Sequence, residues 1–343
     1  MWAKRLTLST EGSVDKTTLE SHFRFGQNWE RLVSQIDEAR VAAAVSDIAD
    51  FLNCTSLAGK SFLDIGCGSG LSSLAAYRLG AAKIVSIDID PLNIQNVVTL
   101  KRKFGVRADH DWRVFPCSIV GPEASALEPA DLVYSWGVLH HTGDMWRALD
   151  NCVRLVKPGG YLYIMLYRDA WCAGPWRLIK RSYTRGGPVW QWILRNGFAS
   201  VLIAGLVAKG KNPRRVMRDY AAKSRGMSWY LDVTDWVGGY PFEYASAQQV
   251  IAYLGARGLR MVRIFPAISR KPLGWRGTGS YRYLFYLGSP SNVGIAFSDD
   301  REVQMRRCEA HAHPSAILTL AGNDPTIVRS SAPRSEPCHA HVL

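Results

Sequence analysis

FLDIGCGSG, the nine residues from Phe62 to Gly70, carries the clearest structural signal in this 343-residue chain. Its first four residues are apolar except for Asp64, which predicts a short buried strand. Three glycines follow at alternate positions: Gly66, Gly68 and Gly70. Apolar residues then recur at helical spacing as far as Gly80. The pattern is strand, glycine turn and helix, in which backbone N–H groups at the start of the helix can approach a ligand closely.

Two carboxylates indicate what kind of ligand the glycine turn binds. Asp64, in the strand, is placed to accept hydrogen bonds from a ligand ammonium group. A second predicted strand, Ile84 to Asp88, also ends on an acid, and an acid at that point usually accepts the hydroxyls of a ribose. Dinucleotide enzymes need G-x-G-x-x-G, whose third glycine would fall where this chain has Leu71. The pattern therefore favours a nucleoside cofactor other than a dinucleotide.

Further strands and helices alternate after this unit, which predicts an α/β fold. A helix is expected from Pro91 to Phe104 and another from Asp144. The remaining predicted strands are Trp112–Phe115, Asp131–Trp136, Tyr161–Tyr167, Met261–Phe265 and Tyr281–Leu287. The first five strands of the chain alternate with helices, so we expect a doubly wound, mostly parallel sheet whose ligand site lies between the tips of the first and fourth strands.

The chain divides into five predicted segments. Residues 1–21 form a flexible arm, 22–167 the α/β core that binds the cofactor, 168–245 a basic helical insert, 246–288 the C-terminal part of the sheet, and 289–343 a disordered tail. Phe23 to Trp29 is rich in aromatics, which fits either a staple onto the core or a flap over the cofactor. Asp235 to Glu243, DWVGGYPFE, is predicted to be a glycine-aromatic loop.

Composition restricts the location and the partners of the protein. No run of eighteen apolar residues occurs, the first residues lack the core of a secretory signal, and the seven cysteines show no paired spacing. We therefore expect a cytoplasmic protein. The net charge is +13, and residues 168–225 hold thirteen Lys and Arg against two acids, a local charge of +11. The body is nearly neutral and the insert is strongly basic.

Four motifs together resemble a known family. FLDIGCGSG, DLVYSWGVLHHTGDMWRALDN, KPGGYLYI and DWVGGYPFE are similar to a bacterial family of class I S-adenosylmethionine (SAM) methyltransferases of the ubiquinone-biosynthesis O-methyltransferase type. The resemblance covers Phe23 to Leu287. It implies a Rossmann-like sheet of seven strands, mostly parallel with an antiparallel last strand, and a helical insert after strand 5. It also implies SAM as the cofactor.

The resemblance assigns residues to the cofactor and the acceptor. The methionine part is expected at Asp64, Gly66, Cys67, Gly68 and Gly70, the ribose at Asp88, and the adenine at Ile89, Ser118 and Ile119, with Trp136 also in the site. The acceptor is expected at Trp236, Tyr240 and Glu243. Relatives often hold the adenine with an acid just past the third strand, but the matching segment here, CSIVG, contains none.

Two histidines after the fourth strand, His140 and His141, are the candidate catalytic residues. A hydroxyl acceptor must lose its proton during methyl transfer, and a histidine of near-neutral pKa is suited to take it. His141 is favoured as the base because His140 directly follows the apolar pair Val138-Leu139. The alternative is that both are structural and that catalysis depends on alignment alone. Ubiquinone-type relatives pair an acid with this histidine and can recruit a metal; that acid is absent, so no metal is expected.

The insert and the tail leave several interpretations open. Residues 168–225 could form a lid over a small-molecule or lipid-linked acceptor, contact an anionic membrane surface, bind nucleic acid, or be solvated without a partner. Nucleic acid is least favoured because no binding module is visible, and no obligate protein partner is inferred.

A methyltransferase acting on N or C atoms, or a non-catalytic or RNA-binding protein on the same fold, remains the alternative to O-methylation. CEAHAH and CHAH in the tail invite a zinc interpretation, although their spacing fits no standard finger.

Overall fold

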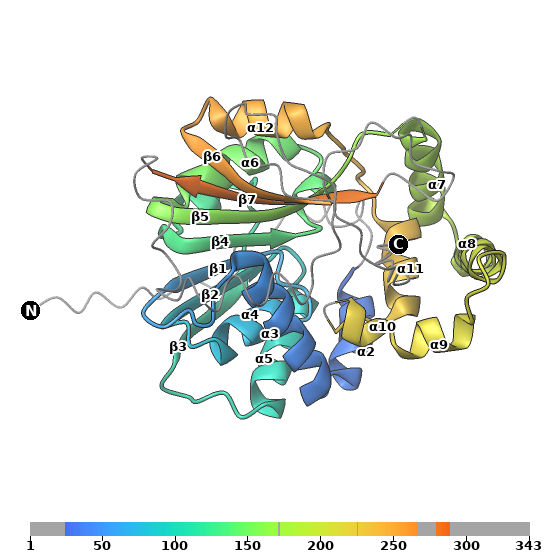
Figure 1. The fold of residues 1–343 in the computed structure, drawn as a ribbon, viewed down its shortest axis with the longest axis horizontal. Coiled ribbons are helices and arrows are strands. Elements are labelled where there is room, and N and C mark those ends of the chain that lie inside the picture. Colours follow the sequence, from blue (N-terminus) through green and yellow to red (C-terminus); the bar gives the residue numbers. More distant parts are fainter. Residues whose placement is uncertain (1–24, 171, 225, 267–278, 289–343) are drawn as a thin grey trace, which may run out of the picture.

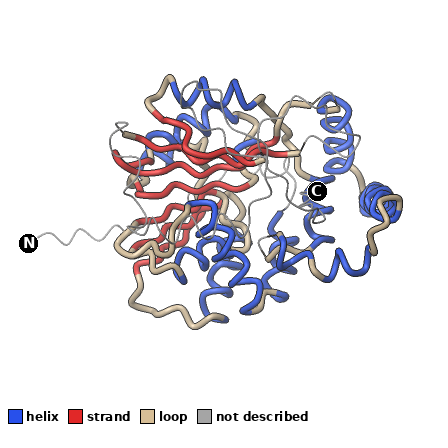
Figure 2. The backbone as a smooth tube through the Cα atoms, viewed as in Figure 1, coloured by secondary structure: helices blue, strands red, loops and turns tan. Residues whose placement is uncertain are grey.

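A seven-stranded sheet forms the centre of the protein, with helices on both faces (Figures 1 and 2). The computed structural model describes residues 25–170, 172–224, 226–266 and 279–288. The strands are β1 Ser61–Ile65, β2 Lys83–Asp88, β3 Asp111–Pro116, β4 Ala130–Trp136, β5 Val156–Tyr167, β6 Leu259–Phe265 and β7 Ser280–Leu287. The predicted arm and the whole predicted tail, with its Cys/His segments, lie outside the described residues.

The strand order is β3-β2-β1-β4-β5-β7-β6. β1 pairs in parallel with β2 on one side and with β4 on the other, so the order reverses between β1 and β4. β7 lies between β5 and β6 and is antiparallel to both. The predicted fold, with its antiparallel last strand, is confirmed. The carboxyl ends of β1 and β4 form the crevice in which open α/β sheets bind ligands.

Two apolar cores cover the two faces of the sheet. On one face, residues of α3 (Glu38–Leu52), α4 (Leu71–Arg78) and α5 (Pro91–Lys103) pack against alternate strand residues such as Phe62 and Tyr134. On the other face, α6 (Met145–Arg154) and α12 (Ala247–Gly255) pack against Leu63 and Val133. Successive strand side chains point to opposite faces, which is why a nearly continuous apolar strand fills both cores.

The insert after β5 is helical, as expected. It comprises α7 Ala173–Arg185, α8 Pro188–Val207, α9 Pro213–Arg218, α10 Tyr220–Lys223 and α11 Trp229–Gly238, and it lies beyond the carboxyl ends of the strands (Figure 1). α2, Phe25–Gln35, lies next to α11 and α5. Short 3-10 turns occupy Pro122–Ala126 and Leu139–His141.

Two local predictions are corrected by the structure. Asp235 to Gly238 belongs to α11 and not to a loop, because Val233 and Val237 repeat at helical spacing and are both buried. The remaining part of DWVGGYPFE, from Gly239, is the loop. β5 begins at Val156, five residues before the predicted start, so Lys157 to Gly160 lies inside the strand. The register there shifts between Ala130 and Leu132, and Gly159 takes a positive φ of 77°, both of which mark a bulge.

Candidate active site

The three alternate glycines form a turn that only glycine can make. Gly66, Gly68 and Gly70 have φ angles of 74°, 52° and 80°, in the left-handed region that disfavours side chains. A Cβ on Gly66 would lie 2.3 Å from the Val138 side chain, and one on Gly68 would lie 3.0 Å from the indole nitrogen of Trp29. The turn therefore packs tightly on both sides, and it ends at the N-terminus of α4.

Asp88 holds the turn in place. One oxygen of its carboxylate accepts the Gly68 N–H at 3.0 Å and the other accepts the Asp90 N–H at 2.9 Å. Burial raises the pKa of Asp88, while these backbone donors act in the opposite direction. The Asn93 side chain also donates to this carboxylate, and contact of Asp88 with ribose hydroxyls stays a prediction.

Asp64 lies deeper, beneath the first turn of α4. Its carboxylate accepts a hydrogen bond from the Ser73 hydroxyl at 2.5 Å. Burial raises its pKa to about 7, and the nearby negative charge of Asp88 adds to this effect. A ligand cation next to Asp64 would favour the ionised carboxylate, so the position fits an ammonium group.

A pocket lies over the turn and has polar and aromatic walls. Its lining includes Trp29 of α2, Asp47 of α3, Asp64 and Cys67 from the turn region, Trp136 at the end of β4 and Met227 before α11. Aromatic faces and carboxylates around one cavity favour a cationic ligand, because both attract positive charge. The pocket brings together Asp64, Gly66, Cys67, Gly68 and Trp136 of the predicted cofactor residues.

Asp47, which lines the pocket, and its ion-pair partner Arg282 were not predicted. Arg282 Nη1 donates to Asp47 Oδ1 at 2.8 Å, and its guanidinium lies 4.6 Å from the centre of the Trp136 ring. The other oxygen, Asp47 Oδ2, is buried without a hydrogen-bond partner among the described residues. A buried acceptor left open in the wall of a pocket fits a bound donor such as the α-ammonium of SAM. The sequence signal was weak: an arginine within the apolar strand YRYLFYL.

The adenine is expected at the segment CSIVG after β3, which contains no acid. In the structure, an acid from outside this segment contacts it. Ser118 N–H donates to Glu123 Oε1 at 2.9 Å, because the short turn from Pro122 brings this carboxylate back over the segment. Glu123 thus supplies an acid that sequence spacing did not reveal. Ile119 is 4% exposed and packs in the second core, with its carbonyl accepting from Asn151, whereas Ile89 is half-buried after β2. Asp88, Ile89, Ser118 and Ile119 lie outside the lining of the pocket.

The two histidines differ in their surroundings. His140 is fully buried, accepts the Tyr167 N–H at Nδ1 over 3.4 Å, and has its pKa lowered well below the usual value by burial. Nδ1 of His141 lies 2.6 Å from the carbonyl oxygen of Pro241. A carbonyl only accepts, so Nδ1 carries the proton and Nε2 of His141 carries the lone pair. The Cε1–Nε2 edge of this ring lies against Gly239, where a Cβ would be 2.6 Å from Cε1 and 2.9 Å from Nε2.

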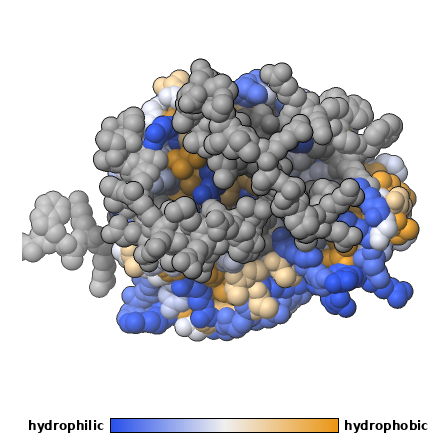
Figure 3. Space-filling model, viewed as in Figure 1, coloured by the Kyte–Doolittle hydropathy of each residue, from blue (hydrophilic) through white to orange (hydrophobic). Residues whose placement is uncertain are grey.

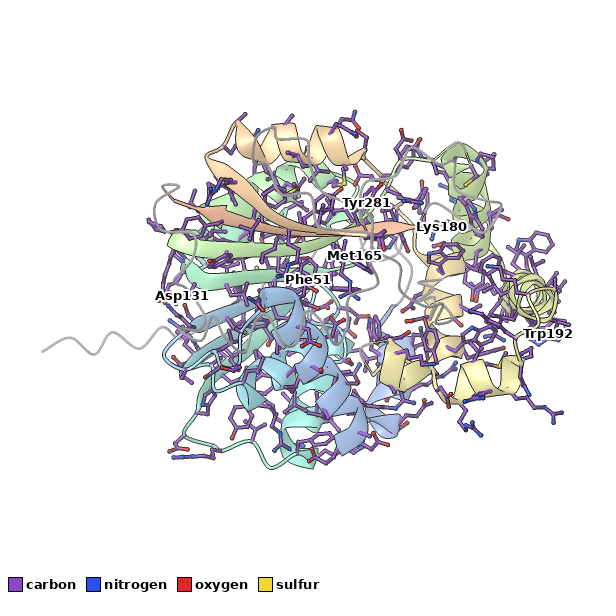
Figure 4. All side chains as sticks on the ribbon, in the orientation of Figure 1. Phe51, Asp131, Met165, Lys180, Trp192 and Tyr281 are labelled. Carbon is purple, nitrogen blue, oxygen red and sulfur yellow. The ribbon has the colours of Figure 1, made fainter. Side chains whose placement is uncertain are left out.

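A buried lysine from the insert lies close to the histidines. Figure 4 places Lys180 beside the insert, whereas Asp131 lies at the opposite end of the strands. The Lys180 ammonium is 5.1 Å from the ring centres of both Tyr167 and Phe242 and donates to the carbonyl of Trp236. Burial lowers its pKa to about 7, which the carboxylate of Asp235 partly opposes. The acceptor side of the site is therefore buried and rich in titratable groups.

The three predicted acceptor residues occupy different places. Trp236 packs 5.1 Å from both Trp176 and Phe198, inside the aromatic core of the insert. Tyr240 is half-buried and precedes Pro241. The Glu243 carboxylate accepts the Met145 N–H at 3.1 Å, at the start of α6, and its own N–H donates to the His140 carbonyl. Their contact with an acceptor stays a prediction.

α2 connects the glycine turn to the insert. Asn28 donates from its amide nitrogen to the Leu231 carbonyl at 3.2 Å and to Asp235 Oδ1 at 2.6 Å, both on α11. The next residue, Trp29, lies against Gly68 and lines the pocket. Leu32 of the same helix and Ile36 just after it are buried in the core. α2 is thus anchored to the core and places Trp29 against the turn, and a role as a flap over the cofactor stays a prediction.

Comparison with known proteins assigns this arrangement to a family. A family model described as a methyltransferase domain matches residues 36–262. The ubiquinone biosynthesis O-methyltransferase of Parvibaculum lavamentivorans is 31% identical over 125 residues, which cover 36% of this chain and 47% of the relative. The ribosomal protein L11 methyltransferase of Azotobacter vinelandii is 36% identical over 113 residues, covering 33% of this chain and 36% of the relative. The chain thus spans less than half the length of these two relatives.

Among solved structures, the magnesium protoporphyrin IX methyltransferase of Synechocystis, with bound S-adenosylhomocysteine (SAH), is 14% identical with a TM-score of 0.45 and covers 76% of this chain and 93% of that one. PKMT2 of Rickettsia typhi, in complex with SAH, is also 14% identical, with a TM-score of 0.47 and a coverage of 71% and 52%.

Proposed function

The chain belongs to the methyltransferase-domain family, and from this premise we propose that it uses SAM to methylate a hydroxyl group of a small or lipid-linked molecule. The family match covers most of the sheet and the glycine turn, so SAM is the cofactor and the class predicted from the sequence is confirmed. The acceptor belongs to the proposal, since the two relatives named above act on different kinds of molecule by their names.

The residues of the pocket fit the groups of SAM. Asp64 and the open oxygen of Asp47 suit the ammonium group, and Arg282 suits the carboxylate at the same end. Trp29 and Trp136 offer aromatic faces to the sulfonium. Asp88 accepts the ribose hydroxyls, and Glu123 lies where it can accept from the adenine amine. Bound SAM supplies a reactive methyl group, so the main task of the protein is alignment.

The single observation that supports a hydroxyl acceptor is the tautomer of His141. Its Nδ1–H is held by the Pro241 carbonyl at 2.6 Å, which leaves Nε2 as a proton acceptor. With SAM bound, a hydroxyl oxygen would bond to the methyl carbon as the carbon–sulfur bond breaks and SAH leaves, and the hydroxyl proton would pass to His141 Nε2. The fully buried His140 supports the ring of His141 from a centroid distance of 4.3 Å.

The test is turnover with an extract of metabolites and lipids. The full-length protein, incubated with SAM carrying a labelled methyl group, is expected to form SAH and to transfer the label to an acceptor bond that resists mild acid and base, as an ether does. A label recovered on nitrogen or carbon would replace the hydroxyl proposal while keeping the methyltransferase. The His141→Ala variant should retain SAM binding and lose transfer.

A further inference from the structure

α8 presents an uncovered apolar face to the outside of the molecule. The helix runs for 20 residues and contains one charged residue, Arg195. Large apolar side chains on its outer side are well exposed: Val189 74%, Trp192 59%, Ile193 45%, Val201 61% and Val207 60%. Figure 3 shows hydrophobic residues over α8 at the right edge of the molecule, and Figure 4 places Trp192 there, away from the sheet.

The inner side of the same helix is apolar as well. Ala199 and Leu202 of α8 are buried against Trp229 and Val233 of α11. A helix that is apolar all round is normally buried all round. Asn196 and Ser200 also lie on the outer side of α8, but large apolar side chains predominate there, and an exposed patch of this kind marks an interaction site.

The two helices that adjoin α8 carry exposed cations. α7 carries exposed Arg177, Arg181 and Arg185, α9 carries exposed Arg214, Arg215 and Arg218, and the two helices adjoin α8 in the ribbon (Figure 1). Asp219 lies 3.2 Å from Arg218 and 3.8 Å from Arg215. Since residues 168–225 contain two acids in all, most of this positive charge is not neutralised within the segment.

We propose that the outer face of α8, together with the arginines of α7 and α9, docks on an anionic phospholipid bilayer. The apolar side chains enter the boundary between headgroups and acyl chains, and the arginines contact lipid phosphates. No helix among the described residues is long and apolar enough to cross a membrane. In the proposed docking, α8 lies in the plane of the surface. The inference rests on the proposed function, because docking there would place the insert side of the site next to a lipid-linked acceptor.

Nucleic acid fits the same surface less well. Bases stack on aromatic rings and phosphates bind cations, but Val189, Val201 and Val207 offer neither contact. A bilayer accommodates branched aliphatic residues as readily as tryptophan, and tryptophan is favoured at the interface. The composition of the exposed face therefore favours a bilayer over nucleic acid.

The experiment measures the binding of the full-length protein to vesicles. Phosphatidylglycerol–phosphatidylcholine vesicles should retain the protein in flotation at 0.1 M salt, whereas phosphatidylcholine alone should not. Acyl chains brominated near the headgroup should quench tryptophan fluorescence in the bound protein, and Trp192→Phe should reduce that quenching. The triple variant Arg214→Gln, Arg215→Gln, Arg218→Gln should bind about 100-fold more weakly, since each basic residue contributes about fivefold at such a surface.

Matched variants separate the apolar face from general effects of charge. Trp192→Glu with Ile193→Glu should lose vesicle binding, whereas Val98→Glu with Val262→Glu, two positions exposed by 36% and 40% elsewhere on the body, should retain it. Calorimetric titration with SAH should be unchanged in all variants, which shows that they are folded. This readout also keeps failure of docking distinct from failure of the proposed function.

Three results would overturn the proposal. The first is no retention of the wild-type protein on anionic vesicles. The second is equal retention of the Trp192→Glu, Ile193→Glu variant. The third is a different occupant of the face. Light scattering could show a dimer that this variant disrupts, or the protein could bind RNA and lose that binding in the variant, while in either case the variant binds vesicles as the wild type does.

Discussion

Replacing Gly68 by alanine tests the cofactor turn at the point where it packs against Trp29 of the pocket wall. Gly68 has a φ of 52°, and a Cβ there would lie 3.0 Å from Nε1 and 3.1 Å from Cε2 of Trp29. An L-residue in this conformation costs about 1–2 kcal/mol. The added methyl group must also displace Trp29 from the turn or shift the Gly68 N–H away from Asp88, so both a wall of the pocket and a ribose ligand are disturbed.

Gly105 provides a matched control for this substitution. Its φ is 60°, and a Cβ on it would meet nothing within 4 Å. Gly105→Ala should therefore lose the same 1–2 kcal/mol of stability in urea denaturation and keep its affinity for SAH. Gly68→Ala should lose at least tenfold in SAH affinity by calorimetry, in addition to the loss of stability. If folded Gly68→Ala binds SAH as tightly as Gly105→Ala does, the reasoning that places the cofactor over this turn is refuted.

Three further predictions concern the carboxylates and the base. Asp88→Ala should weaken SAM binding by about 1.5–3 kcal/mol, the range for hydrogen bonds to a charged group, and an unchanged affinity in calorimetry would remove Asp88 from the site. Because the pKa of Asp64 is raised to about 7, its carboxyl is mostly protonated below that pH and must lose this proton when the ligand ammonium binds. SAH affinity should then rise with pH from about 5 to about 7 and level off above, with a slope that Asp64→Asn abolishes; a flat profile in the wild type argues against this contact. His141→Ala should cut turnover about 100-fold or more at constant SAM affinity; if His140→Ala is the inactive variant instead, the roles of the two histidines are reversed.

The sheet could be predicted from the sequence because its signals are local. Asp64, Asp88 and the glycines sit at strand ends, where a change from apolar run to glycine or acid marks the boundary. The end of α11 was missed because glycines in DWVGGYPFE outweighed the buried pair Val233 and Val237. The early start of β5 was missed because KPGG resembles a turn, whereas in the structure it is a bulge within the strand.

The site was only partly predictable because several of its residues come from distant segments. Asp47 and Arg282 are 235 positions apart, and only the pairing of β7 with β5 brings the arginine to the pocket. Glu123 reaches Ser118 through a turn that no spacing rule reveals. In the sequence, nothing distinguishes Lys180 from the other lysines and arginines of the insert. Its burial follows from the packing of α7 against α11.

The central claim is that the glycine turn binds SAM and not a dinucleotide, and a comparison of SAH binding with NAD⁺ binding tests it most directly. Calorimetric titration of the full-length protein with SAH and with NAD⁺ compares the two cofactor classes that use a glycine turn of this kind. The account predicts saturable binding of SAH at one site, competition with SAM, and no heat from NAD⁺ at the same concentrations. Tighter binding of NAD⁺, or no binding of SAM and SAH by the folded protein, would contradict it.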